Sequence, residues 1–277
     1  MVISADDYQA FQKLLHEKSG ILLGENKQYL VSSRLSSFLK EQNLTDLSAL
    51  LKALTRPGND KLLQQVIDRM TTNETLWFRD GFPFDFLINT ILPEQKANNK
   101  NNINIWCAAC SSGQEPYSIT IALDEASRSA NRHKMPMSVD IVATDISSRI
   151  LEQARNAEYQ SLEITRGLTP QRQSAHFDLQ ADGTYQLKPH LKKNVRFSTL
   201  NLMQTPYRLG GQYDVVFCRN VLIYFASDLK IKVINSIADC LKPGGYLFLG
   251  ASESMPSSIE RFEMVRCNPG LVYRKRP

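Results

Sequence analysis

Polar and charged side chains follow the apolar runs in the second half of the chain, and they could bind a small cationic ligand. The run that ends near Cys107 continues as C-A-A-C-S-S-G-Q-E, so small residues and Gly113 precede Glu115. Small residues let a ligand approach the backbone, and a carboxylate favours a positive charge. Asp145 ends the run I-V-A-T-D, where an acidic side chain can accept hydrogen bonds from both ribose hydroxyls of a nucleoside. A nucleoside that carries a cationic group is one interpretation of these residues, although an Asp at a strand end can also cap the following helix.

The role of Glu115 has two interpretations. Gly113 is the only glycine in its loop, which is a poor match to a G-x-G-x-x-G phosphate loop and argues against a dinucleotide. Glu115 could bind a cationic ligand, or it could cap the following helix through the positive end of the helix dipole. The spacing alone favours neither.

Redox, metal and histidine-based chemistries fit the sequence less well. Cys107 and Cys110 have C-x-x-C spacing, but they span the end of an apolar strand, whereas a redox pair opens a helix. No second cysteine pair completes a zinc site, so no metal is expected. The histidines are scattered, and an ordinary surface position is expected for each: His16, His133, His176 and His190.

A doubly wound, mostly parallel α/β sheet is expected to position these side chains. Apolar runs predict strands at 103–109, 139–144, 195–200, 214–218 and 246–250, and helical patterns fall near 115–129, 147–157 and 227–241. In such sheets, ligands bind beyond the carboxyl ends of the strands. Asn201, Leu202, Arg219 and Asn220 follow two further strands and should join Glu115 and Asp145 at that edge.

Two further features surround this sheet. The last residues read as an antiparallel hairpin across Asn268-Pro269-Gly270, and a parallel sheet that ends in such a hairpin is typical of S-adenosylmethionine methyltransferases. Residues 159–194 break the alternation with turn signals and short β-like pieces. They predict an inserted β subdomain.

The first 70 residues predict a small all-α domain of four short helices, because apolar residues recur there at helical spacing. A capping box at Ser4 begins the first helix and Gly20 ends it. Residues 71–102 are expected to connect the domains and contribute to the cofactor site, with one more helix over 82–92 that stops near Pro93. Residues 103–277 complete the larger domain. The polar stretch 71–79, T-T-N-E-T-L-W-F-R, indicates a site at the junction.

Composition predicts a soluble cytoplasmic protein. The chain has 277 residues, 42% of them hydrophobic, and lacks both a long apolar stretch and a secretory signal. Five cysteines at irregular spacing indicate reduced thiols. The net charge of +5 lies beyond residue 80, and its basic patches fit a solvated surface at least as well as a polyanion site.

Several motifs together resemble the CheR family of chemotaxis receptor glutamate O-methyltransferases. They are T-T-N-E-T-x-W-F-R, W-C-A-A-C-S-S-G-Q-E-P-Y-S, A-T-D-I-S, F-C-R-N-V-L-I-Y-F and L-K-P-G-G-Y-L-F-L-G-x-S-E, in the family's order. The resemblance implies a helical domain, a Rossmann-like S-adenosylmethionine domain and an inserted β subdomain. It implies methyl transfer to glutamates on the cytoplasmic signalling helices of methyl-accepting chemotaxis receptors, which yields S-adenosylhomocysteine and serves sensory adaptation.

The resemblance also implies roles for residues. Asn73, Thr75 and Arg79 would reach the cofactor from the inter-domain segment, Asp145 would take the ribose, and Asn201-Leu202 would lie near the adenine. The other pocket residues would be Gly113, Glu115, Arg219 and Asn220. Arg79 would position the substrate carboxylate and Tyr224 would shape the methyl site, while Glu74 has no assigned role and is expected at the surface.

The implied reaction needs no general base, because a glutamate with a pKa near 4.3 is already ionised at neutral pH. Basic residues on the second helix, Lys27, Arg34 and Lys40, would meet the acidic receptor, although the helical domain is neutral overall. Nucleic acid and membrane insertion are not expected, and the chain is expected to be a monomer. A methyltransferase with a different substrate, or a cofactor-binding adaptor without activity, are the alternatives.

Overall fold

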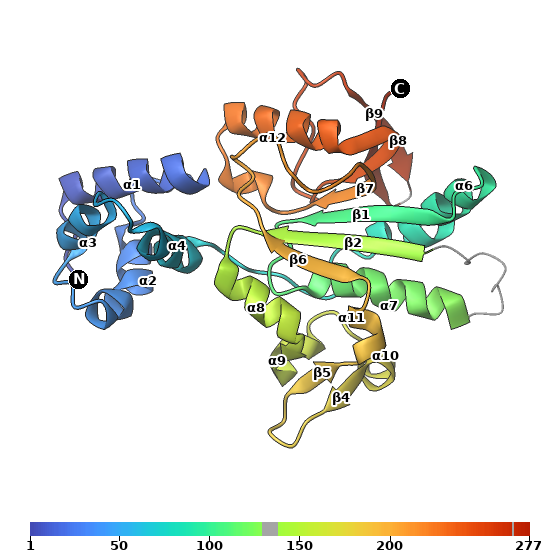
Figure 1. Cartoon of the computed structure of the whole chain (residues 1–277), viewed down its shortest axis with the longest axis horizontal. Helices are drawn as coiled ribbons and strands as arrows, with labels where there is room; N and C mark the ends of the chain where they lie inside the picture. The colour runs from blue at the N-terminus through green and yellow to red at the C-terminus, as the bar shows by residue number, and fades with distance from the viewer. Residues whose placement is uncertain (129–137, 268) are drawn as a thin grey trace.

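Four amphipathic helices form a bundle at the N-terminal end of the chain, beside the larger domain (Figure 1). They are α1 (Ala5–Ser19), α2 (Gln28–Glu41), α3 (Leu47–Leu54) and α4 (Asp60–Met70). Ser4 caps α1 by accepting the backbone N–H of Asp7, and Gly20 ends the helix in the left-handed conformation. Apolar stripes from all four helices pack into one core, which includes Phe11 and Leu35. The predicted four helices are confirmed.

The computed structural model describes residues 1–128, 138–267 and 269–277. Its main sheet has the strand order β6-β2-β1-β7-β8-β10-β9. Strands β1 (Asn102–Ala108), β2 (Ser138–Asp145), β6 (Val195–Thr199), β7 (Tyr213–Cys218) and β8 (Leu241–Phe248) run parallel, and β9 (Phe262–Cys267) and β10 (Gly270–Lys275) are antiparallel. The predicted mixed sheet with a C-terminal hairpin is therefore confirmed, although Asn268 of the predicted turn lies outside the described residues.

Three long helices cover the faces of this sheet: α7 (Gln114–Arg128), α8 (Ser148–Asn156) and α12 (Ser227–Cys240) (Figure 1). Each lies near its predicted range, but Ser129, the predicted end of α7, lies outside the described residues. Strand β8 begins at Leu241, earlier than predicted. Its pairing with β7 continues to Leu241 through a shift of register, in a stretch that contains Gly244 at φ 73°. Glycine accommodates the irregularity that the apolar pattern did not reveal.

The inserted region contains a separate three-stranded sheet with the order β3-β5-β4, formed by β3 (Glu158–Tyr159), β4 (Phe177–Leu179) and β5 (Tyr185–Leu187). It also contains three short helices that the sequence did not predict: α9 (Ser161–Thr165), α10 (Pro170–His176) and α11 (Pro189–Lys192). The insert is thus a mixed α/β unit below the main sheet in Figure 1. Helices of four to seven residues are too short to show a periodic apolar stripe.

The helix predicted over 82–92 does not stop near Pro93. It consists of α5 (Phe82–Phe86), a π-helical turn η1 (Leu87–Ile91) and α6 (Leu92–Ala97). Pro93 lies in the first turn of α6, directly after the π turn. The π turn, in which Leu92 N–H bonds the Leu87 carbonyl, joins the two segments. No helix in the described parts of the chain is long and apolar enough to span a membrane.

Candidate active site

A cleft of about 1040 Å³, open solvent at its mouth included, lies between the helical bundle and the carboxyl edge of the main sheet. The cleft brings together all but one of the predicted site residues: Asn73, Thr75, Arg79, Glu115, Asp145, Asn201, Leu202, Arg219, Asn220 and Tyr224. Segments from five places in the sequence therefore share one cavity.

Gly113 is the predicted site residue that does not line this cleft. It adopts φ 93°, and a Cβ there would lie 3.0 Å from the Tyr117 ring and 3.2 Å from the Ala154 side chain. The glycine lets the loop after β1 turn closely over α7 and α8. Its contribution here is the shape of the loop.

Asp145 joins three parts of the site. Its carboxylate accepts the backbone N–H of Ser111 at 2.9 Å and that of Ser147 at 3.0 Å. The Ser111 hydroxyl in turn donates to the carbonyl of Asn73 at 2.9 Å. Burial raises the pKa of Asp145, although the backbone N–H groups oppose that shift. The end of β2, the loop after β1 and the inter-domain segment are thus held in one arrangement.

Glu115 is paired across the cleft rather than only capping its helix. Arg219, whose side chain is 2% exposed, donates to Glu115 Oε2 at 3.0 Å and to Asp80 Oδ2 at 2.6 Å. Burial raises the pKa of Glu115, and the Arg219 guanidinium opposes this. Arg219 also donates to the carbonyl of Arg79 at 2.7 Å. The buried arginine therefore fixes the end of the 71–79 segment and leaves two carboxylates around one cation.

Arg79 and Tyr224 are both partly exposed at the cleft. Arg79 Nη1 donates a long hydrogen bond of 3.4 Å to the carbonyl of Glu74. Tyr224 ends a 3₁₀ turn, Leu222–Tyr224, and its carbonyl accepts the N–H of Leu22 at 3.1 Å. A weakly held guanidinium and a phenol thus border the same cavity.

Glu253, from the L-G-x-S-E motif, is a functional candidate for which the sequence suggested no role. Its carboxylate accepts the N–H groups of Asn220 at 2.7 Å, Gly250 at 2.8 Å and Ile223 at 3.2 Å. Asn220 itself adopts φ 60°. Glu253 therefore fixes the loop that carries Asn220 and Tyr224, and only the motif itself pointed to it.

Arg34 was predicted to belong to a basic surface that meets the receptor, but its guanidinium is bound within the protein. Its guanidinium donates to the carbonyls of Met70 at 2.6 Å and Thr71 at 3.2 Å, and to the Thr72 hydroxyl at 3.1 Å. It satisfies carbonyls at the end of α4, as cations near helix C-termini do. Lys27 and Lys40 are exposed, as expected.

Trp77 attaches the 71–79 segment to the insert. It is fully buried, and its ring lies edge-on to Tyr159 at 5.0 Å and to Phe177 at 5.1 Å. The backbone N–H of Trp77 donates to the carbonyl of Arg166 at 3.1 Å. Glu74 is exposed, as expected, and pairs with Arg166. The insert is therefore anchored to the segment that lines the cleft.

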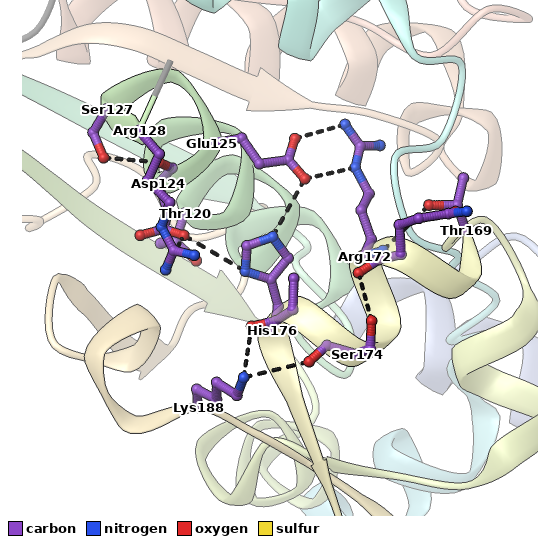
Figure 2. A network of polar contacts seen from close by, with 12 residues as sticks. Thr120, Asp124, Glu125, Ser127, Arg128, Thr169, Arg172, Ser174, His176 and Lys188 are labelled. Carbon is purple, nitrogen blue, oxygen red and sulfur yellow. Dashed lines mark hydrogen bonds and ion pairs between the residues drawn. The ribbon is translucent and has the colours of Figure 1, made fainter. Parts of the chain in front are cut away.

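The expectation that His176 lies at the surface is wrong. His176 is 2% exposed and lies between α10 and α7, where Nε2 is 3.3 Å from Glu125 and Nδ1 is 3.6 Å from Asp124 (Figure 2). Arg172 binds Glu125 with two hydrogen bonds of 2.8 and 2.9 Å. Acidic residues on α7 and basic residues on α10 thus connect the insert to the main domain, away from the cleft.

The cleft fits a nucleoside with a cationic sulfur and an amino-acid end. Asp145 offers a carboxylate beside small loop residues, and Glu115 offers a second carboxylate for a cation. Arg219 Nε and Asn220 Oδ1 are buried at the cleft and have no hydrogen-bond partner among the described residues, so they can bind the carboxylate and ammonium of an amino acid. The sheet and this donor set define a methyltransferase of the S-adenosylmethionine class.

Comparison with known protein families agrees with this class of methyltransferase. The family "CheR methyltransferase, SAM binding domain" matches residues 73–271, and "CheR methyltransferase, all-alpha domain" matches residues 6–71. The chain belongs to the CheR methyltransferase family, and S-adenosylmethionine is its cofactor.

Curated relatives are similar over nearly their whole length. The chemotaxis protein methyltransferase Cher2 of Pseudomonas putida is 46% identical over 98% of this chain and 98% of its own. Chemotaxis protein methyltransferase of Vibrio anguillarum is 47% identical over 99% of this chain and 98% of its own. Chemotaxis protein methyltransferase 1 of Pseudomonas aeruginosa is 46% identical over 98% of both chains.

Proposed function

We propose that this methyltransferase esterifies glutamate side chains on the cytoplasmic signalling helices of methyl-accepting chemotaxis receptors and so serves sensory adaptation. One observation carries the proposal: among the described residues, each carboxylate that lines the cleft already has a partner, Glu74 with Arg166, Glu115 with Arg219, and Asp145 with the N–H groups of Ser111 and Ser147. No histidine in the described parts of the chain lines the cleft, and burial raises the pKa of the Cys110 thiol well above its ordinary value. A carboxylate substrate fits such a site because it is already an ionised nucleophile.

The cofactor supplies an electrophilic methyl group on a positively charged sulfur. Arg79 pairs with the incoming carboxylate at the mouth of the cleft and directs one of its oxygens inward. Tyr224 limits the space around the transferred methyl group, which favours alignment of the reacting atoms. No proton has to move, so Arg79 and Tyr224 act by position.

The exposed lysines of the helical bundle suit an acidic partner. Lys27 and Lys40 are exposed on or beside α2, while Arg34 is occupied by backbone carbonyls. The expected docking charge is therefore smaller than the sequence suggested. Electrostatic attraction of this kind raises the association rate more than the affinity.

The proposal is tested with methyl-labelled S-adenosylmethionine and membranes that contain a chemotaxis receptor. We expect labelled receptor that releases methanol under mild alkali, because a carboxyl methyl ester hydrolyses there. Arg79→Ala should remove most of the transfer, whereas Arg166→Ala, which changes an exposed arginine paired with Glu74, should not. A product stable to alkali would indicate another substrate, and cofactor binding without labelling would indicate an adaptor.

A further inference from the structure

We propose that residues 19–22, the connector after α1, form a third wall of the cofactor site beside its nucleoside end. Ser19 and Ile21 line the cleft together with Leu200, Asn201 and Leu202. None of the motifs in the sequence falls on the connector. The inference rests on cofactor binding and is independent of the receptor substrate.

The connector has a fixed shape. Gly20 adopts φ 75°, and its N–H donates to the carbonyl of His16 at 2.8 Å. The Ser19 hydroxyl, which is buried, donates to the carbonyl of Leu15 at 2.6 Å. This helix end therefore presents Ile21 to the cleft in one orientation rather than as part of a loose loop.

The connector also packs tightly against the larger domain. A Cβ on Gly20 would lie 2.6 Å from Leu229 Cδ2 and 3.1 Å from Met203 Sδ. Leu229 belongs to α12 and Met203 to the loop after β6, so two parts of the larger domain contact this glycine. A side chain at position 20 would have to displace the ends of these two side chains.

Two hydrogen bonds connect the end of α1 and the connector to residues of the site. Asn201 Nδ2 donates to the carbonyl of Lys18 at 2.7 Å, while its Oδ1 accepts the N–H of Met203 at 3.0 Å. The N–H of Leu22 donates to the carbonyl of Tyr224 at 3.1 Å. Displacement of the connector would therefore move both the Asn201 loop and Tyr224.

The chemistry of this wall suits the flat, apolar faces of a purine. Ile21 contributes an aliphatic side chain, and Ile146, Leu200 and Leu202 contribute others to the same cleft. The Asn201 side chain is held in place at both polar ends, so its loop keeps these apolar surfaces beside the base. Ile21 excludes water from the base, and the helical bundle thereby contributes to cofactor affinity.

The first test measures S-adenosylhomocysteine binding by titration calorimetry for Ile21→Ala and Leu23→Ala. Both residues are partly buried and pack on the core of the helical bundle, but only Ile21 lines the cleft. We expect Ile21→Ala to weaken binding roughly five- to tenfold and Leu23→Ala less than about twofold. Equal weakening by both variants, or no weakening by Ile21→Ala, would overturn the proposal.

A second pair separates the packing of Gly20 from backbone strain. Gly20→Ala adds a collision with the larger domain, whereas Gly58→Ala adds a Cβ with nothing within 4 Å at a similar φ of 84°. We expect Gly20→Ala to weaken S-adenosylhomocysteine binding and Gly58→Ala to leave it unchanged, with both checked for folding by circular dichroism. Unchanged binding in folded Gly20→Ala would contradict the proposal. Neither test uses a receptor, so failure to methylate glutamate would leave these results unaffected.

Discussion

Arg219 binds Glu115 at 3.0 Å with its side chain almost completely buried. The pair joins the loop after β7 to the start of α7, and Asp80 adds a third charge from the inter-domain segment. A buried charge without its partner is strongly unfavourable. Arg219 therefore both holds these three segments together and sets the charge that the cofactor meets.

Arg219→Met should lower the free energy of unfolding by about 3–5 kcal/mol, because it leaves the buried Glu115 carboxylate without its cation. In Arg219→Met/Glu115→Gln the loss should be smaller than the sum of the single losses, since no buried charge remains at position 115. Urea unfolding of the four proteins at neutral pH measures this coupling. Additive losses would show that the pair is not coupled.

Glu253→Gln should reduce methyl transfer by up to about 10²-fold, because the loop that holds Asn220 and Tyr224 loses an acceptor and shifts. Asp214→Asn is the control: this buried carboxylate accepts the N–H of Asn104 at 3.0 Å, at the start of β1 and far from the cleft edge. Steady-state kinetics should show a lower kcat for Glu253→Gln. Asp214→Asn should lower the stability of the fold but leave kcat unchanged. Similar kcat values in the two variants would refute a positioning role.

Gly167→Ala should destabilise the protein more than Gly183→Ala. Both glycines lie in the insert at positive φ, but a Cβ at 167 would lie 2.1 Å from the Trp77 carbonyl oxygen, whereas one at 183 meets nothing within 4 Å. Strain of about 1–2 kcal/mol is common to both, and the collision adds about 1–3 kcal/mol at 167. If the urea unfolding midpoints of Gly167→Ala and Gly183→Ala coincide, the insert does not pack tightly against Trp77 at position 167.

The contribution of His176 to stability should fall as the pH drops below about 6.5, the ordinary pKa of histidine. Burial lowers the pKa of His176, against the effect of Glu125, Asp124 and their hydrogen bonds. Below 6.5 the unfolded chain therefore binds a proton at His176 that the folded chain does not, and the difference grows until the folded pKa is reached.

His176→Gln should remove this part of the pH dependence, which urea unfolding between pH 7.5 and about 5 would reveal. His190→Gln should retain it, because the His190 side chain is 45% exposed. A wild-type slope in His176→Gln would mean that another group is responsible.

The sequence predicted the sheet edge well, because strand ends in a parallel sheet share one side. Glu115, Asp145, Asn201 and Arg219 followed predicted strands and do line one cleft. Contacts between distant segments were not predictable in this way. Ile21 and Trp77 have no periodic signal for their partners, since Ile21 meets loops about 180 residues away and Trp77 meets the insert.

The errors have related causes. Arg34 was expected in a basic surface that meets the receptor; it is partly exposed, but its guanidinium binds the carbonyls at the end of α4. His176 was expected at the surface because its partners on α7 lie about 50 residues earlier in the chain. The short helices of the insert and the π turn before Pro93 depend on tertiary packing rather than on local pattern.

The central claim is that this chain methylates glutamate carboxylates of chemotaxis receptors. The most direct measurement is mass spectrometry of a receptor signalling fragment after incubation with the enzyme and S-adenosylmethionine. We predict one added methyl group on specific glutamate side chains, absent from the matching Glu→Gln fragments and from reactions with Arg79→Ala. The claim would be contradicted if this enzyme left the fragment unmodified while a known receptor methyltransferase methylated the same fragment. A methyl group on any other kind of side chain would also contradict it.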